Sequence, residues 1–150
     1  MTGRGLFLAA ALAAGLALAA PARAQGIVEL RQQGMQIMQQ SMDRLIALEQ
    51  APPAAYRPRE VLEMLFRINN VLPGLKRLFP NSPTARGGRA SPVIWQLRTV
   101  FDGHFDEAIQ HADRAMEMAK RLGTARQIMR EELGGLARAC NACHTQFLLN

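Results

Sequence analysis

The segment IVELRQQGMQIMQQSMDRLIALE, residues 27–49, contains the pattern that decides the fold. Its apolar and small residues recur at intervals of three and four, which places them along one face of a helix. These residues are Ile27, Leu30, Gly34, Met35, Met38, Met42, Leu45 and Leu48. A helix of this length with one apolar face must bury that face against other elements. The segment therefore predicts a long helix within a helical bundle.

A second helix follows a break that is rich in proline. Ala51-Pro52-Pro53 ends the first helix, because proline lacks an N–H donor and restricts the residue before it. The second helix begins near Pro58, since proline suits the first turn. Its apolar residues are Val61, Leu62, Leu65, Ile68 and Leu72. We expect Pro73-Gly74 to end or kink it.

Two more helices occupy the second half of the chain. Residues 80–90 have loop composition, and Ser91-Pro92 is a helix cap followed by a first-turn proline. The third apolar face is Ile94, Leu97, Phe101, Phe105, Ala108, Ala112, Ala115, Met116 and Ala119. Gly123-Thr124 breaks this helix, and Thr124 with Gln127 resembles a capping box. The fourth apolar face is Ile128, Leu133, Leu136, Cys140, Cys143, His144 and Phe147.

The sequence contains no segment that alternates with the period of two expected of a strand. Short connections between long helices make neighbouring helices antiparallel. We therefore predict an all-α protein built as one antiparallel four-helix bundle.

The N-terminus has the features of a signal peptide. Arg4 precedes an apolar run from Leu6 to Ala20, and Ala22-Arg23-Ala24 resembles a cleavage site. The run is short for a membrane helix, which needs about 20 residues, although a retained anchor is the alternative. We expect residues 1–24 to be removed, residues 25–150 to form the bundle, and the mature protein to reach the periplasm without a membrane span.

The charge pattern excludes some partners. The net charge is +6, and loss of Arg4 and Arg23 leaves 16 basic against 12 acidic residues. The basic residues are scattered beside acidic ones, which is typical of a solvated surface. With one Tyr and one Trp, the chain offers little for bases to stack on, so we expect no nucleic-acid binding.

The motif CNACH, residues 140–144, is the C-x-x-C-H pattern of covalent haem attachment. Residues three and four apart lie on one face of a helix. Cys140 and Cys143 can therefore form thioether bonds to one haem c, while His144 directs its imidazole at the iron. We predict a haem bound within the bundle near its C-terminal helix.

Other uses of these cysteines fit less well. A disulfide at this spacing closes a very small loop and would stabilise the fold little. A thioredoxin-like redox site needs a βαβ context, which is absent from the sequence. A structural zinc site needs four ligands, so His104 or His111 would have to join Cys140, Cys143 and His144.

The chain resembles the cytochrome c-prime family, the class II c-type cytochromes. The resemblance covers residues 25–147 and rests on RQQGMQIM (31–38), CNACHTQF (140–147) and the helix lengths. LFP (78–80) and SPVIW (91–95) are more similar to the low-spin members. The resemblance implies a four-helix bundle with haem attached near the C-terminus, and many members are dimers packed through their first two helices.

The resemblance also implies what faces the iron opposite His144. In this family the residue four after the first-helix arginine lies on the distal side, and here it is Met35. High-spin members have a bulky group there that does not bind the iron, and they admit small gases such as NO. Low-spin members place a coordinating methionine there. Met38 is the alternative ligand if the register differs by one turn, and His104 is a bis-histidine alternative.

Further residues take roles by the same resemblance. Arg31 would pair with a haem propionate, and Phe147 would pack near the haem. A basic residue usually stands four after the haem histidine, but here it is Leu148, unless Arg138 substitutes. From Gly34 beside Met35 we expect room for a close macrocycle.

We expect a monohaem c-type cytochrome that carries single electrons and is not an enzyme, with low-spin iron ligated by His144 and Met35. Its partners would be redox proteins, and a homodimer is compatible with the sequence. The alternative is a high-spin, five-coordinate cytochrome that binds NO or other small gases, with Met35 only packed above the iron.

Overall fold

The computed structural model describes residues 20–122 and 126–149 and is all-helical in that part of the chain. Its helices are α1 (Ala20–Gln50), α2 (Pro58–Arg77), α3 (Val93–Gln96), α4 (Arg98–Leu122) and α5 (Arg126–Phe147). Two 3₁₀ turns, Pro53–Ala55 and Pro83–Ala85, lie in the connections. The predicted all-α class and four-helix bundle are confirmed, with α3 as a short addition.

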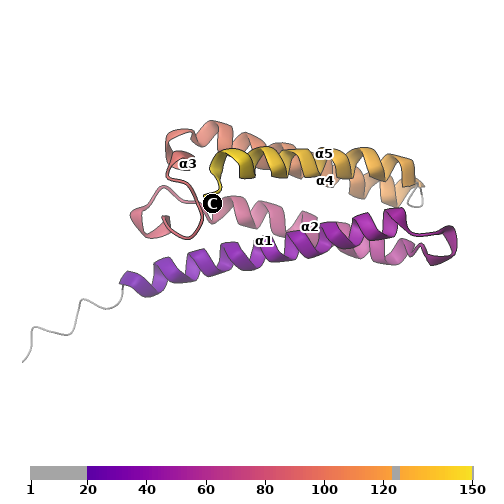
Figure 1. Ribbon diagram of the computed structural model, residues 1–150, viewed down its shortest axis with the longest axis horizontal. Coiled ribbons are helices and arrows are strands. Elements are labelled where there is room, and N and C mark those ends of the chain that lie inside the picture. The colour runs from indigo at the N-terminus through magenta and orange to yellow at the C-terminus, as the bar shows by residue number, and fades with distance from the viewer. Residues whose placement is uncertain (1–19, 123–125, 150) are drawn as a thin grey trace, which may run out of the picture.

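The four long helices form two antiparallel pairs (Figure 1). Helix α1 packs along α2, α2 along α4, and α4 along α5, whereas α1 and α5 touch over a much smaller area. The loop between α2 and α4 folds over one end of the bundle, beside the C-terminus. The α1–α5 side of the bundle is consequently its most open side.

An aromatic cluster fills the bundle at the end that carries this loop. Phe101 lies at the centre of the cluster, with ring centroids 4.8 Å from Phe79, 5.3 Å from Phe105 and 5.3 Å from Phe147. All four side chains are buried. Edge-to-face packing of this kind adds to the hydrophobic gain of burial. The cluster ties α2, α4 and α5 together near the C-terminal motif.

Pro73-Gly74 does not end α2, so that part of the prediction is wrong. The helix continues to Arg77, with Pro73 inside it. Proline removes one backbone hydrogen bond. Leu72 and Leu75 are both buried on the core side of α2, and their packing holds the last turn in place.

The third predicted helix is divided in two at Leu97. This residue ends α3 with φ −110° and ψ 43°, outside the helical region, and α4 begins at Arg98. Leu97 is 42% exposed, so its predicted place on the apolar face is wrong. The helix begins one residue later than predicted: Pro92, not Ser91, occupies the N-cap position of α3, although Oγ of Ser91 accepts a hydrogen bond from the N–H of Val93 at 3.3 Å.

Some predictions fall outside the described residues. These are the break at Gly123-Thr124, the Thr124–Gln127 capping box, and most of the proposed signal peptide. Over the described parts, residues 20–122 and 126–149, no helix combines the length and hydropathy that a membrane crossing requires.

Candidate functional site

Two cavities lie side by side between α1 and α5. The methionine cavity, about 340 Å³, is lined from α1 by Met35, Met38 and Met42. The arginine cavity, about 290 Å³, extends toward the loop at 80–90 and is lined by Arg31 and Arg89. Both cavities share the side chains of Met35, Phe105, Cys143 and His144. These shared residues mark the centre of one elongated site.

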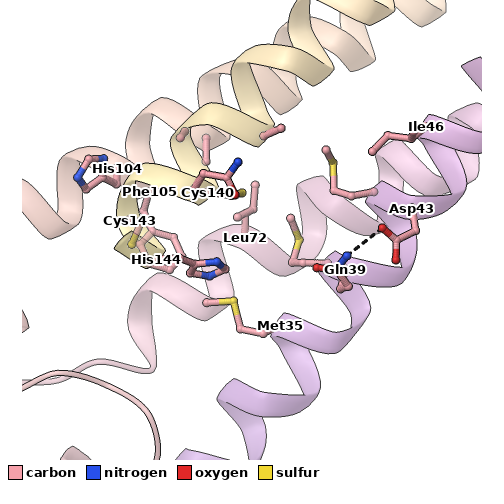
Figure 2. A pocket seen from close by; sticks show the side chains of 16 residues that line it. Met35, Gln39, Asp43, Ile46, Leu72, His104, Phe105, Cys140, Cys143 and His144 are labelled. Atoms are coloured by element: carbon pink, nitrogen blue, oxygen red, sulfur yellow. Dashed lines mark hydrogen bonds between the residues drawn. The ribbon is translucent and has the colours of Figure 1, made fainter. Parts of the chain in front are cut away.

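Met35 and His144 lie on opposite sides of this centre. Figure 2 shows Met35 extending from α1 and His144 from α5, with their side chains directed toward one another. Met35 is half-buried, and Met38, one turn further along α1, belongs to the core. The placement of Met35 as the residue that faces His144 therefore agrees with the sequence spacing from Arg31.

The cysteines of the motif lie on the inner side of α5. Buried Leu133, Leu136 and Ala139 hold that side of the helix against the core. Cys140 and Cys143 follow on the same side with free, half-buried thiols. Burial raises the pKa of Cys140, and burial together with Cys140 raises the pKa of Cys143 to about 11. Both thiols are therefore neutral near pH 7.

Arg31 is buried although it is charged. Its side chain is 5% exposed, and Nη2 donates a hydrogen bond to the carbonyl of Ala85 at 2.7 Å. The guanidinium also lies 4.7 Å from the ring centroid of Phe79. Burial lowers the pKa of Arg31. The buried Nη1 has no hydrogen-bond partner within the described residues, so the arginine cavity contains an unsatisfied cationic donor.

The C-terminal tail closes one wall of the arginine cavity. Ser91 N–H donates to the carbonyl of Phe147 at 2.9 Å, and Leu149 N–H donates to that of Arg89 at 2.8 Å. Phe147 is buried in the aromatic cluster and lines this cavity, as does Leu148. Arg138 lines neither cavity, so the substitution that the sequence suggested for it has no support.

We had expected Gly34 to leave room for a macrocycle, but it does not. A Cβ at this position would lie 2.5 Å from Cδ2 of Leu75 and 2.9 Å from its Cγ. Gly34 therefore faces α2 and allows α1 to approach it closely. The sequence could not distinguish these uses, because both place a glycine beside a buried residue.

The two histidines of α4 have different settings. His104 lines the methionine cavity but lies apart from Met35 and His144 in Figure 2, and its Nε2 is 3.4 Å from Oε1 of Gln146. His111 contacts Glu132 of α5, with Nδ1 2.6 Å from Oε2. The His111 side chain is only 18% exposed.

The residues around the two cavities suit a haem. Paired thiols and an imidazole stand on one helix face, a sulfur faces them from α1, and the walls between are mainly apolar. The unsatisfied nitrogen of Arg31 would complement a propionate. Over the described residues, no group of three His, Cys, Asp or Glu side chains could hold a metal ion by itself.

A family model described as Cytochrome C' matches residues 26–148. The chain belongs to the cytochrome c' family. This cytochrome c' is thus a member of a family that binds haem c, and the predicted family and cofactor class are confirmed. A search of curated proteins found no significant match.

Solved structures of other cytochromes c' share the fold of this cytochrome c'. A nitric oxide complex of a variant from Alcaligenes xylosoxidans has a TM-score of 0.75 at 20% identity, covering 86% of this chain and 98% of that one. The cytochrome c' from Rubrivivax gelatinosus has a TM-score of 0.75 at 19% identity, and the match covers 84% of this chain and 97% of that one. A third structure is a cytochrome c' described by its ligand-controlled dimer dissociation. Its TM-score is 0.75 at 19% identity, and the match covers 85% of this chain and 97% of that one. At these identities the likeness establishes the fold alone.

The prediction of a low-spin electron carrier, with Met35 as a second iron ligand opposite His144, is wrong. The matching family is that of cytochrome c', whose members are typically high-spin, five-coordinate and able to bind NO. The error arose because a methionine that faces a haem has the same sequence signature whether or not it binds the iron.

Proposed function

We propose that this chain is a cytochrome c' that binds NO or other small gases at a five-coordinate haem iron. The observation that supports this most strongly is the family match across residues 26–148, which spans both cavities. Binding of a gas at a ferrous haem needs one open axial position and no further reacting group from the protein. The proposed activity is therefore reversible ligand binding, and the chain is not an enzyme.

Attachment of the haem is assigned to α5. Cys140 and Cys143 would form the thioether bonds, and His144 would be the proximal ligand. Their position on one helix face, on the wall of the methionine cavity, supports this assignment. Arg31 would donate to a propionate, and Phe147 would pack against the proximal side from the aromatic cluster. The haem supplies the axial site for the gas when it is bound.

Met35 is assigned the distal side without coordination. Its half-buried side chain faces His144 across the shared centre of the two cavities. A thioether is flexible and polarisable, so it fills irregular space well. A bulky residue packed here would leave room for a diatomic molecule and oppose larger ligands. Met35 would thus select ligands by size.

We also propose that the protein is exported to the periplasm after removal of residues 1–24. The family match begins at residue 26, directly after the proposed mature start at Gln25. Redox partner proteins, which we predicted for an electron carrier, stay an untested prediction.

A homodimer through α1 is a further proposal. Leu30 and Ile37 lie seven residues apart, and hence on one helix face, and they are 52% and 39% exposed. Exposure of Leu30 contradicts its predicted core position, and a partner would remove it from water. Sedimentation of the wild type and of Leu30→Glu would test this: the variant should shift toward monomer, and a wild type that is monomeric at every concentration would overturn it.

The visible spectrum and NO titration test the proposed function. The purified protein should show broad high-spin bands and bind NO in the ferrous state. A six-coordinate low-spin spectrum that does not change when NO is added would overturn the proposal.

Covalent attachment is tested by mass spectrometry. The wild type should carry the mass of one haem, and the double variant Cys140→Ser, Cys143→Ser should carry none. A wild type with the bare polypeptide mass would end the haem assignment.

A further inference from the structure

Arg89 lies in the same cavity as the proximal histidine. It comes from the loop before Ser91, far in sequence from α5, and lines the arginine cavity together with Cys143, His144 and Leu148. A cation and the proposed proximal ligand therefore share the wall of one cavity.

Backbone pairing fixes this loop against the tail. An antiparallel bridge joins Ala90 and Leu148. Leu149 N–H donates to the carbonyl of Arg89 at 2.8 Å, while Nε of Arg89 donates to the carbonyl of Leu149 at 3.0 Å. Arg89 is thus held by both its main chain and its side chain. Arg89 also lines the arginine cavity.

The glycines before Arg89 explain how the loop reaches this place. Gly87 and Gly88 have φ of 138° and 64°, which other residues rarely adopt. A Cβ on Gly88 would lie 2.9 Å from Cγ1 of Val28, so the loop also packs tightly on α1. The loop consequently packs between α1 and the C-terminal tail, and Arg89 lies at the end of the loop.

The cavity contains cations and no compensating acid. Arg31 and Arg89 line it, and no Asp or Glu is among its lining residues in the described parts of the chain. Arg31 is already engaged with Ala85 and Phe79. Arg89 is the cation of this cavity whose side chain is bonded to the C-terminal tail, through the carbonyl of Leu149.

We propose that Arg89 supplies a positive charge to the cavity that also contains His144, and that this charge, held in place by the carbonyl of Leu149, favours the reduced haem. This rests on the proposed haem ligation by His144. A ferric haem carries one more positive charge than a ferrous one, so a neighbouring cation disfavours the ferric form. Since Arg89 is exposed, salt screens part of the effect. A basic group supplied by this loop compensates for Leu148 at the position where the sequence lacks one.

The reduction potential of the holoprotein tests the proposal. Arg89→Gln should favour the ferric form by roughly three- to tenfold, where tenfold is about 59 mV for one electron. Arg89→Lys should stay within about twofold of the wild type, because it keeps the charge. Arg86→Gln is the matched control: it removes one positive charge from the same loop, but Arg86 lies over the Trp95 ring at 5.3 Å and lines neither cavity.

The outcomes separate this proposal from the proposed function. A shift in Arg89→Gln that shrinks at high salt and exceeds that of Arg86→Gln supports the role of Arg89. Equal shifts in the two variants, or no shift in Arg89→Gln with haem mass and spectrum intact, would overturn it and leave gas binding standing. Absence of haem from the wild type would overturn both.

Discussion

Methionine above a haem iron can coordinate the metal or only occupy the space there. Met35 faces His144 from α1, and its neighbours on the same cavity wall include Met38 and Leu72. Apolar walls of this kind favour small uncharged ligands over water or anions. In the five-coordinate state that we propose, the size of the Met35 side chain controls which molecules reach the iron.

Met35→Ala should therefore widen ligand selection without changing the spin state. Relief of a steric clash of about 1–3 kcal/mol corresponds to a gain of roughly 5- to 150-fold in affinity. Titration of the ferrous protein with an alkyl isocyanide, which is larger than a diatomic molecule, measures this, and carbon monoxide affinity should change much less. Met64→Ala is the control, since Met64 is buried on α2 and lines neither of the two cavities. A low-spin wild type that becomes high-spin in Met35→Ala would show that Met35 binds the iron.

We expect Arg31 to contribute more to the stability of the haem-loaded protein than to that of the haem-free protein. A buried charge without a partner is costly, and breaking a buried pair costs about 3–5 kcal/mol. Arg31→Met should destabilise the haem-loaded protein by about that amount, because a propionate would lose its donor. In the haem-free Cys140→Ser, Cys143→Ser background the same change should cost far less. Urea unfolding of the four proteins measures both values, and equal losses would argue against a propionate contact.

The residues that we propose to bind the haem differ in how far the sequence could predict them. Cys140, Cys143 and His144 are close in sequence, so helical spacing alone places them together. Arg89 and Phe79 join the site through the loop at 80–90, whose path depends on Val28 and on the tail. No periodicity describes such a loop. Long-range contacts of this kind lie outside what a local pattern can predict.

The helices α1 and α2 depend on one close approach. Gly34 of α1 faces Leu75 of α2, which is buried and has little space to move. Arg44 and Glu60 join the same two helices at the opposite end through a paired contact, with Nη2 of Arg44 2.7 Å from Oε2 of Glu60. The ion pair is exposed and contributes little, so the packing at Gly34 sets the spacing of the pair.

Gly34→Ala should separate α1 from α2 and lower stability by about 1–3 kcal/mol, the usual cost of overpacking. Gly103→Ala is the control, because a Cβ there meets no atom within 4 Å. It should raise stability by roughly 0.5–1 kcal/mol, since alanine favours a helix interior over glycine. Thermal or urea unfolding gives both values. If Gly34→Ala were as harmless as the control, Leu75 must move aside easily and the approach would not be tight.

Helix prediction succeeded where burial and spacing agree and failed where packing outweighs a local signal. The core positions Leu45, Leu65 and Leu136 are fully buried, as their spacing predicts. Pro73 was expected to end or kink α2, but the helix continues across it to Arg77, where Leu72 and Leu75 are buried. Leu97 was expected in the core, yet the chain leaves the helix there. Tertiary contacts decided both cases.

Across the whole molecule, the α4–α5 pair is joined by a polar cluster on the outside of the core. Glu132 of α5 accepts from His111 at 2.6 Å and from Nε of Arg114 at 3.0 Å. A Cβ on Gly135 would overlap the His111 ring, so this glycine makes room for it. The cluster lies one to two turns before Cys140 on the helix that carries the motif. Its loss should weaken the support of α5 against α4.

The pH dependence of unfolding tests this cluster. Burial raises the pKa of Glu132, but hydrogen bonds from His111 and Arg114 outweigh it and leave the pKa below its ordinary 4.5. A carboxyl with a lowered folded pKa stabilises the fold above its unfolded pKa and loses that effect as pH falls through the folded value. Wild-type stability should therefore fall below about pH 4.5, and Glu132→Gln should reduce that slope.

Glu131→Gln is the matched control, because Glu131 is the exposed neighbour on the same helix. Both variants remove one carboxylate, so general charge effects on the positively charged chain are alike in the two. Urea unfolding at several pH values between 3 and 7 should show a flatter profile for Glu132→Gln than for Glu131→Gln. Identical profiles would mean that the His111–Glu132–Arg114 contacts do not couple protonation to folding. The α4–α5 pair would then be held by its apolar face alone, through Ala108, Ala112 and Leu136, all of which are buried.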